Sequence, residues 1–369
     1  MKKVFVGFLA FALCSCSDSS SPASVEPGGI SPDESPAGRM FVKAAGKSTV
    51  LGSNSSSKTD ETPEMKVLFS YDFSIGEHEV TCDEYNSFAS RPLGCSGDIP
   101  ATNVTYFDAV LLANEKSKAE GLDTAYEYTS AVFSEAGNCT DLGGFSFRPE
   151  RNAYRLPTEA EWILVASQDF RPSASWNSGN SDYKPHPVCS VEGRSEICDM
   201  AGNAAEWGND WKGKFRDTVL VNFVGASDGG SLGERVLKGG SFRNSPSAMT
   251  LHSRGDVYTV TSSMFADYVG FRLALGKIPD AVYLDKNGLA SNTPVRLKAS
   301  SHDLKNKLGN YRMKLVFRKD DSGNLAFVNY QNASLSVTEI PDTIDAYHPA
   351  ISPDGKRVAF CTRPEGISG

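Results

Sequence analysis

The chain opens with two lysines and a short apolar stretch, and this feature decides in which compartment the rest of it folds. Lys2 and Lys3 precede residues 4–13, which contain no charged side chain. A membrane-spanning helix needs about 20 apolar residues, so this stretch is too short to cross a bilayer and has the form of an export signal. We therefore expect the chain to fold in an oxidising compartment, where cysteines pair as disulfides.

The apolar stretch ends in the sequence Leu-Cys-Ser-Cys at residues 13–16. It resembles the lipobox of bacterial lipoproteins, in which the last cysteine takes a diacylglycerol on its sulfur before the signal is cleaved. The resemblance implies that residues 1–15 are a lipoprotein signal peptide and that Cys16 is the lipidated N-terminus. Ser17, and no aspartate, follows Cys16, which implies an outer-membrane location in the cell envelope. An ordinary secretory signal with two unrelated cysteines is the alternative.

Composition limits the partners of the chain. Residues 16–37 are rich in Ser, Pro and Gly, which is typical of a flexible tether. Residues 1–15 hold two of the 37 basic residues and no acidic one, so their removal leaves 35 basic and 45 acidic residues, a net charge of −10. This balance argues against a nucleic-acid partner, which needs a basic stripe. No later stretch is apolar for long enough to span a membrane, so we expect the lipid to be the membrane anchor.

Six cysteines follow Cys16, at positions 82, 95, 139, 189, 198 and 361. In an oxidising envelope these residues are disulfide candidates rather than metal thiolates. Cys189 with Cys198 would close a short local loop, and Cys82 with Cys95 is a second plausible pair. The sequence does not fix the connectivity, so both pairings stay hypotheses.

Periodicity and capping signals predict an α+β domain with few long helices. Residues 40–42, 48–51 and 66–75 have the patterns of strands. Thr105 is suited to cap a helix that runs through Val110 and Leu111. Thr158 and Glu161 have the spacing of a capping box and predict another helix start. After residue 210 the chain is rich in glycine and irregular.

Seven segments, in the same order, resemble the formylglycine-generating enzyme (sulfatase-modifying factor) domain family. The two most specific are Tyr-Arg-Leu-Pro-Thr-Glu-Ala-Glu-Trp at residues 154–162 and Cys-Asp-Met-Ala-Gly-Asn-Ala-Ala-Glu-Trp at residues 198–207. The others begin at Met40, Phe73, Asn103, Leu237 and Val269. Together they cover residues 38–275, and they imply a compact, loop-rich fold related to C-type lectins.

Most of these residues are expected to support the scaffold. Gly239 and Gly240 permit positive φ or close backbone approach. The expected core anchors are Trp162, Trp207 and Phe271. The arginines expected to tie loops to carboxylates or carbonyls are Arg155, Arg243 and Arg272.

One loop of the resemblance implies a calcium site. Asp199, Gly202, Ala204 and Glu206 match positions of a family calcium loop, which uses side-chain oxygens at its ends and backbone carbonyls between them. A turn that contains glycine can direct several oxygens at a hard cation. The alternative is a tight turn in which Glu206 caps backbone N–H groups or pairs with an arginine.

The resemblance fails at the catalytic residues. Oxidases of the family use two copper-binding cysteines five residues apart, and soft thiolates are what Cu(I) prefers. Here residues 242–269 contain no cysteine, and Pro246 and Leu251 align with the two thiol positions. The five histidines are too scattered to form the three-histidine iron site of related enzymes. We therefore expect no copper cofactor and no catalytic residues of either kind.

The C-terminal region has different patterning. Residues 276–310 are polar and weakly patterned, which predicts a linker, and residues 311–369 carry four alternating strand patterns. Residues 348–360 resemble the repeat of TolB-type β-propellers, with a Ser-Pro-Asp-Gly turn at residues 352–355. Propellers need about four or more blades, so this all-β segment resembles one blade, a partial propeller repeat.

These observations favour a lipoprotein that binds a ligand, either a glycan or a protein, without catalysing a reaction. Two alternatives remain. One is a formylglycine-generating oxidase or another oxidoreductase with an unrecognised site. The other is a structural component of an envelope assembly, because fold alone does not determine function.

Overall fold

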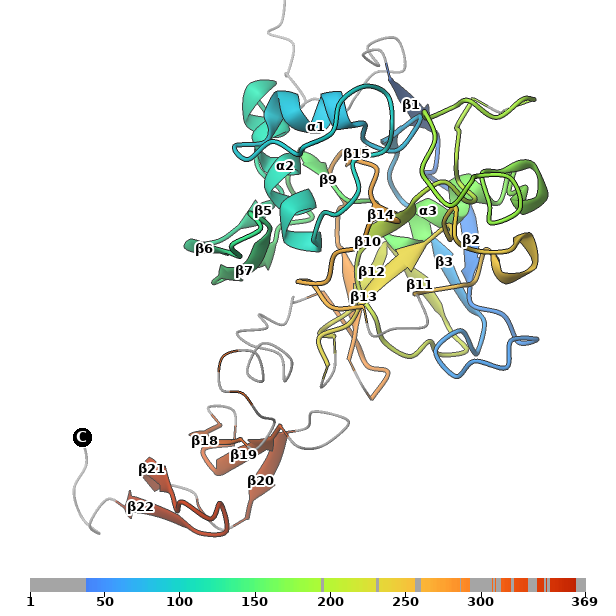
Figure 1. Cartoon of the computed structure of the whole chain (residues 1–369). Coiled ribbons are helices and arrows are strands. Elements are labelled where there is room, and N and C mark those ends of the chain that lie inside the picture. Colours follow the sequence, from blue (N-terminus) through green and yellow to red (C-terminus); the bar gives the residue numbers. More distant parts are fainter. Residues whose placement is uncertain are drawn as a thin grey trace, which may run out of the picture.

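The computed structural model describes residues 38–193, 196–229, 232–255, 260–285, 287–292, 307, 309, 313–319, 322–330, 337–341, 343 and 346–362. The expected signal peptide, the tether and Cys16 lie outside these residues. The described chain combines short strands with three α-helices, so it is a mixed α and β fold of low helix content (Figure 1).

The first sheet joins the beginning and the end of the domain. It has four strands in the order β1-β4-β15-β9, namely β1 (Arg39–Val42), β4 (Phe73–Gly76), β15 (Ala274–Leu275) and β9 (Tyr154–Arg155). All its pairs are antiparallel, and Ile75 of β4 faces Met40 on one side and Ala274 on the other.

The second sheet lies at the centre of the domain in Figure 1. Its path β13-β10-β12-β16-β17 consists of β13 (Arg235–Lys238), β10 (Ala205–Trp211), β12 (Phe223–Ala226), β16 (Val282–Leu284) and β17 (Ala290–Ser291), and β14 (Val269–Gly270) pairs with β10. The β10–β14 and β12–β16 pairs are parallel. This arrangement places Glu206, near the start of β10, opposite Gly270 of β14.

Smaller sheets complete the domain. A three-stranded sheet, β11-β3-β2, contains β11 (Val219–Val221), β3 (Met65–Leu68) and β2 (Ser48–Leu51). Two-stranded pairs are formed by β5 (Tyr126–Glu127) with β8 (Ser146–Phe147) and by β6 (Ser130–Phe133) with β7 (Cys139–Gly143). The predicted single strand at residues 66–75 is therefore two strands in different sheets. Between them, the Asp72 carboxylate accepts hydrogen bonds from the N–H groups of Ala44 and Ala45, which fixes the bend.

The α-helices begin at capping boxes. The helices are α1 (Cys82–Phe88), α2 (Tyr106–Ala119) and α3 (Glu159–Ala166), with short 3₁₀ turns η2 (Pro172–Ala174) and η3 (Pro246–Ala248). At Thr105 and Thr158 the threonine side chain accepts a backbone N–H three residues later, and that residue's carboxylate accepts the threonine N–H. The predicted helix starts at Thr105 and Thr158 are confirmed, and Thr81 forms a third capping box with Glu84.

Two apolar clusters form the core. One lies under α1 and α2 and contains Trp207 and Phe271, and the other surrounds α3 and contains Trp162. All three aromatic side chains are completely buried, as predicted. Gly239 and Gly240 have φ values of +86° and +70°, so the conformational freedom predicted for them is used.

The segment expected to be a linker begins within the domain. Residues 276–310 include β16 and β17, and β16 adds a parallel strand to β12. Ile278 and Leu284 are buried in the core cluster around α3. The expectation of a linker starting at residue 276 is therefore wrong for residues 278–284, because a three-residue strand is too short to show periodicity.

The C-terminal strands form sheets of their own. One sheet has β18 (Lys314–Arg318), β19 (Leu325–Asn329) and β20 (Val337–Ile340), and the other has β21 (Ala346–Ile351) and β22 (Val358–Thr362). The predicted turn is present: Gly355 has φ +67° and donates its N–H to the carbonyl of Ser352. The described residues show a three-stranded and a two-stranded sheet here, and no propeller.

Within the part of the chain that the structure describes, no helix is both long enough and apolar enough to cross a membrane.

Candidate functional site

Glu206 and Arg272 form a buried ion pair beneath the loop that was expected to bind calcium. Arg272 Nε lies 2.6 Å from Glu206 Oε2, and Arg272 Nη2 lies 2.7 Å from Glu206 Oε1. The indole N–H of Trp162 also donates to Glu206 Oε2, at 2.9 Å. Both charged side chains are fully buried. This pair therefore fixes α3, β10 and the segment after β14 to one another.

Two further carboxylates, those of Glu79 and Asp199, lie close to this pair. Glu79 accepts hydrogen bonds from the Ala204 N–H and the Asn203 side-chain amide, both at 2.8 Å. Burial, together with the charges of Asp199 and Glu206, raises the pKa of Glu79 well above its usual value. Burial also raises the pKa of Asp199. Burial lowers the pKa of Arg272, but the charge and hydrogen bonds of Glu206, with the charges of Glu79 and Asp199, together raise it, so the guanidinium stays charged.

The loop at residues 199–206 has an unusual backbone. Asp199, Gly202 and Asn203 all have positive φ. A Cβ atom at Gly202 would collide with the backbone oxygen of Trp176 and with the Ser175 side chain, so only glycine fits there. The loop thus lies directly against the segment at residues 175–176.

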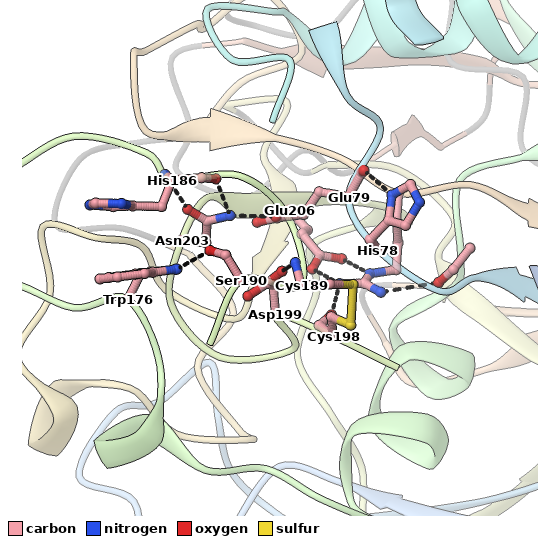
Figure 2. The surroundings of a disulfide bond; sticks show 12 residues. His78, Glu79, Trp176, His186, Cys189, Ser190, Cys198, Asp199, Asn203 and Glu206 are labelled. Carbon is pink, nitrogen blue, oxygen red and sulfur yellow. Dashed lines mark hydrogen bonds and ion pairs between the residues drawn. A yellow bond between two sulfur atoms is a disulfide. The ribbon is translucent and has the colours of Figure 1, made fainter. Parts of the chain in front are cut away.

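The Cys189–Cys198 disulfide closes the neighbouring loop, with its Cα atoms 5.0 Å apart. The Cys189 N–H donates to Asp199 Oδ2 at 2.7 Å, the Cys198 N–H donates to the Glu77 carbonyl at 2.8 Å, and Arg272 donates to the Cys198 carbonyl at 2.9 Å. Figure 2 shows these contacts around the disulfide. The covalent bond and the buried ion pair therefore hold the same loop from two sides.

An aromatic pair supports the same loop on its other flank. The Trp176 and His186 rings stack with centroids 3.7 Å apart, and the Trp176 indole N–H donates to Ser190 Oγ at 2.9 Å. In the view of Figure 2 this pair lies on the opposite side of the disulfide from His78. The second predicted disulfide, Cys82–Cys95, is also present and joins α1 to the loop that follows it. Among the described residues Cys139 and Cys361 are free thiols.

The residues aligned with the calcium loop already have partners within the protein. Both oxygens of Glu206 already accept hydrogen bonds from Arg272 and Trp162. One oxygen of Asp199 accepts the Cys189 N–H. Among the described residues no three Asp, Glu, His or Cys side chains are grouped so that they could hold a metal ion. The arrangement fits the arginine-paired alternative, in which Arg272 already neutralises Glu206, and calcium binding stays a prediction.

The two positions that align with the family's cysteine pair hold residues that are not thiols. Pro246 begins η3, and Leu251 follows it in the same loop. Lys238 beside this loop is fully buried and donates to the carbonyls of Leu251 and Ser253, at 2.8 and 2.7 Å. Burial lowers its pKa. These contacts satisfy the ammonium group, which acts as a structural tie.

Glu159 completes this second buried network. It lies 3.3 Å from Lys238 Nζ and 2.9 Å from Arg254 Nε. Arg254 donates further to the carbonyls of Asp60 and Gly213. Sequence reasoning missed the roles of Lys238 on β13, Glu159 on α3 and Glu79, because a single charged residue gives no periodic signal of burial or of its partner. It did predict the loop-tying arginines: Arg155 pairs with Glu161, Arg272 with Glu206 and Arg243 with Asp267.

Comparison with known proteins identifies relatives of limited similarity. A protein named chaperone protein LppX, from Paenibacillus barcinonensis, is 29% identical over 175 residues, which cover 38% of this chain and 62% of the relative. The match therefore spans less than two thirds of that relative.

A solved structure with a TM-score above 0.5 shares the fold. Treponema denticola variable protein 1 is 24% identical with a TM-score of 0.52, over 64% of this chain and 94% of that protein. PvdO from Pseudomonas aeruginosa is 19% identical with a TM-score of 0.45, over 64% of this chain and 94% of PvdO.

The family described as sulfatase-modifying factor enzyme 1-like domain (FGE-sulfatase) matches residues 28–277, which is more than half of the chain. This span contains α1 to α3, both disulfides and both buried ion-pair networks. The chain therefore belongs to the FGE-sulfatase family.

Proposed function

We propose that this protein is a lipid-anchored, extracytoplasmic binding protein that holds polypeptides and catalyses no oxidation. One observation carries the proposal: residues 242–269 contain no cysteine, and by the family resemblance Pro246 and Leu251 align with the two catalytic cysteines. Neither side chain can bind copper, because Cu(I) in proteins prefers thiolate or thioether ligands. The domain has the fold of the family but lacks the cysteine pair needed for copper-dependent oxidation. We therefore favour a binding function.

Three observations support the location and the type of ligand. The two disulfides fit an oxidising compartment. The Leu-Cys-Ser-Cys sequence at residues 13–16 supplies a cysteine for lipid attachment. A relative carries the name chaperone, and a chaperone binds polypeptides. We therefore favour a polypeptide ligand over a glycan.

The first test concerns chemistry. The purified protein is incubated with copper, oxygen and a cysteine-containing sulfatase-type peptide, and the peptide mass is followed. We expect no conversion of the cysteine to formylglycine. Copper-dependent conversion would overturn the proposal in favour of an oxidase.

The second test concerns the ligand. Fluorescence anisotropy measures binding of labelled, reduced and carboxymethylated α-lactalbumin, which stays unfolded, and a glycan array is run in parallel. We expect saturable binding of the unfolded protein. Saturable glycan binding without polypeptide binding would replace the proposed ligand.

A further inference from the structure

A small apolar cavity opens between the first two helices and the first sheet. Its volume is about 80 Å³. Since a single water needs roughly 10–15 Å³ of such volume, the cavity has room for one side chain. Its floor is formed by the buried side chains of Val80, Leu112 and Leu273, and Phe88 at the end of α1 forms part of its rim.

The charges at one end of this cavity are already paired. The Lys116 ammonium lies 3.3 Å from Glu120 and 4.5 Å from the centre of the Phe88 ring. The Arg39 guanidinium lies 3.7 Å from Glu120 and donates to the Tyr154 hydroxyl. At this end two cations therefore share one carboxylate, which leaves one net positive charge beside the apolar floor.

A second, larger cavity adjoins the other end. His78 and Glu84 line both cavities, so the two open next to each other. The second has a volume of about 470 Å³, and the Cys189–Cys198 disulfide forms part of its wall. We call the two cavities together the trough.

The second cavity is acidic. Four carboxylates line it, from Glu77, Glu84, Asp98 and Glu196, and no described residue forms an ion pair with any of them. Glu84 accepts the Thr81 N–H with one oxygen as part of the α1 capping box. The trough therefore joins a hollow with an apolar floor to four carboxylates that have no ion-pair partner among the described residues.

We propose that the trough binds an extended polypeptide segment in which an apolar side chain is followed by lysine or arginine. This inference rests on the proposed function and names the site and the type of segment. The apolar side chain enters the hollow above Val80 and Leu112, and the basic side chains lie over Asp98 and Glu196. Charge complementarity selects this occupant, because acidic segments and anionic glycans would be repelled by the same carboxylates.

The probe is a fluorescently labelled, N-acetylated peptide amide of sequence Gly-Phe-Lys-Lys-Gly-Gly, measured by anisotropy against the whole protein. Matched probes replace Phe by Ser or both Lys by Glu. We expect the Phe-Lys-Lys peptide to bind most tightly and its affinity to fall with added salt, because exposed charges are screened beyond about 10 Å at 0.1 M salt.

The charge arm compares two double variants of equal net charge. Asp98→Asn with Glu196→Gln removes two carboxylates of the trough, whereas Asp123→Asn with Glu135→Gln removes two exposed carboxylates elsewhere. We expect the trough variant to bind the probe roughly two- to thirty-fold more weakly, since an exposed ion pair changes an equilibrium constant by up to about fivefold. We expect no change in the control variant.

The apolar arm compares Phe88→Ala, at the rim of the hollow, with Phe265→Ala, an exposed phenylalanine elsewhere. We expect Phe88→Ala to lose most of the preference for the Phe probe over the Ser probe, and Phe265→Ala to retain it. Melting curves show that each variant is folded.

The outcomes separate the two proposals. Equal binding by the trough and control variants, or equal binding of the Lys and Glu probes, would overturn the trough as the site and leave the proposed function standing. Failure of the unaltered protein to bind both the peptides and unfolded α-lactalbumin would overturn the proposed function itself.

Discussion

Glu206 holds three distant segments together through one carboxylate. It accepts hydrogen bonds from the indole of Trp162 and from the guanidinium of Arg272. The side chains of Glu206 and Arg272 are both fully buried. Removing one partner of a buried ion pair leaves the other charge uncompensated in a medium of low polarity, and this cost far exceeds the loss of a surface pair. The domain therefore depends on this residue for its stability, whatever it binds.

The first prediction compares a buried with an exposed ion pair. Glu206→Gln leaves Arg272 buried and uncompensated, so we expect a loss of about 3–5 kcal/mol in the free energy of unfolding. Asp267→Asn breaks the exposed pair with Arg243 and should cost less than about 1 kcal/mol. Urea unfolding monitored by tryptophan fluorescence measures both. Equal losses would contradict the role assigned to the buried pair.

The second prediction concerns calcium. If Asp199 and Glu206 are calcium ligands, as the resemblance implies, we expect millimolar calcium to raise the melting temperature relative to magnesium, and Asp199→Asn to remove the rise. A ligand at a hundredfold excess over its Kd stabilises by about 2.7 kcal/mol, so a real site would be evident in the melting curve. The absence of a calcium-specific rise in a folded sample would favour the alternative in which Arg272 neutralises Glu206.

The third prediction concerns the buried carboxyl group of Asp210. The backbone of Glu159 is close to it, but neither oxygen reaches hydrogen-bond geometry with a described residue. Burial raises its pKa well above the usual value, so the folded state holds a proton that the unfolded state releases near pH 3.9. Its contribution to stability is therefore present at low pH and is lost as pH rises toward the folded-state pKa.

Asp210→Asn removes this titration. Relative to the unaltered protein, we expect the variant to gain stability as pH rises, by up to about 1.4 kcal/mol per pH unit. Urea unfolding at pH 5.5 and pH 8.5 gives the difference at each pH. A difference that does not vary with pH would show that Asp210 is ionised in the folded chain.

At the scale of elements, the features set by neighbouring residues were predictable from the sequence. The features set by contacts between distant segments were not. The helix starts at Thr105 and Thr158 follow from contacts within four residues, so the sequence contains all of their determinants. Strands of two or three residues, such as β14 and β16, contain no measurable period and exist because a partner strand lies beside them. The same reasoning applies to the site: the resemblance pointed to the loop that contains Asp199 and Glu206, whereas Glu79 and the trough depend on packing between distant segments.

The fourth prediction tests whether β16 belongs to the domain. Leu284 is buried in the core beside β12, and Leu289 nearby is exposed. Leu284→Ala should cost about 2–5 kcal/mol, the range for a buried leucine, while Leu289→Ala should be close to neutral. Thermal or urea unfolding of the two variants checks this. A neutral Leu284→Ala would restore the original expectation of a linker from residue 276.

At the scale of the whole molecule, the proposed anchor places the domain next to a membrane. A diacylglyceryl group with an added acyl chain is sufficient for stable attachment. The 22 residues between Cys16 and Arg39 would, as a flexible coil, span about 26 Å on average. The trough, which Arg39 lines, would then operate within a few nanometres of the bilayer.

The fifth prediction concerns this anchor. Cys16→Ser removes the sulfur that takes the lipid, so we expect loss of radioactive palmitate labelling and recovery of the protein in the soluble fraction. Cys14→Ser, on the removed side of the cleavage point, should retain both label and membrane association. Label that persists on Cys16→Ser would contradict the lipoprotein interpretation.

The pairing of β4 with β15 has a consequence for the time course of folding. Ile75 faces Ala274, and Val67 of β3 faces Leu220 of β11, so two sheets are completed by strands far downstream. Contacts of such long range make folding slow, typically milliseconds to seconds. A chain delivered from its N-terminus can pair β1 with β4 and β2 with β3 early, but neither of these two sheets is complete until β11 and β15 arrive. The open edges of β3 and β4 therefore stay unpaired, and accessible to proteases, until the strands near residues 220 and 274 arrive.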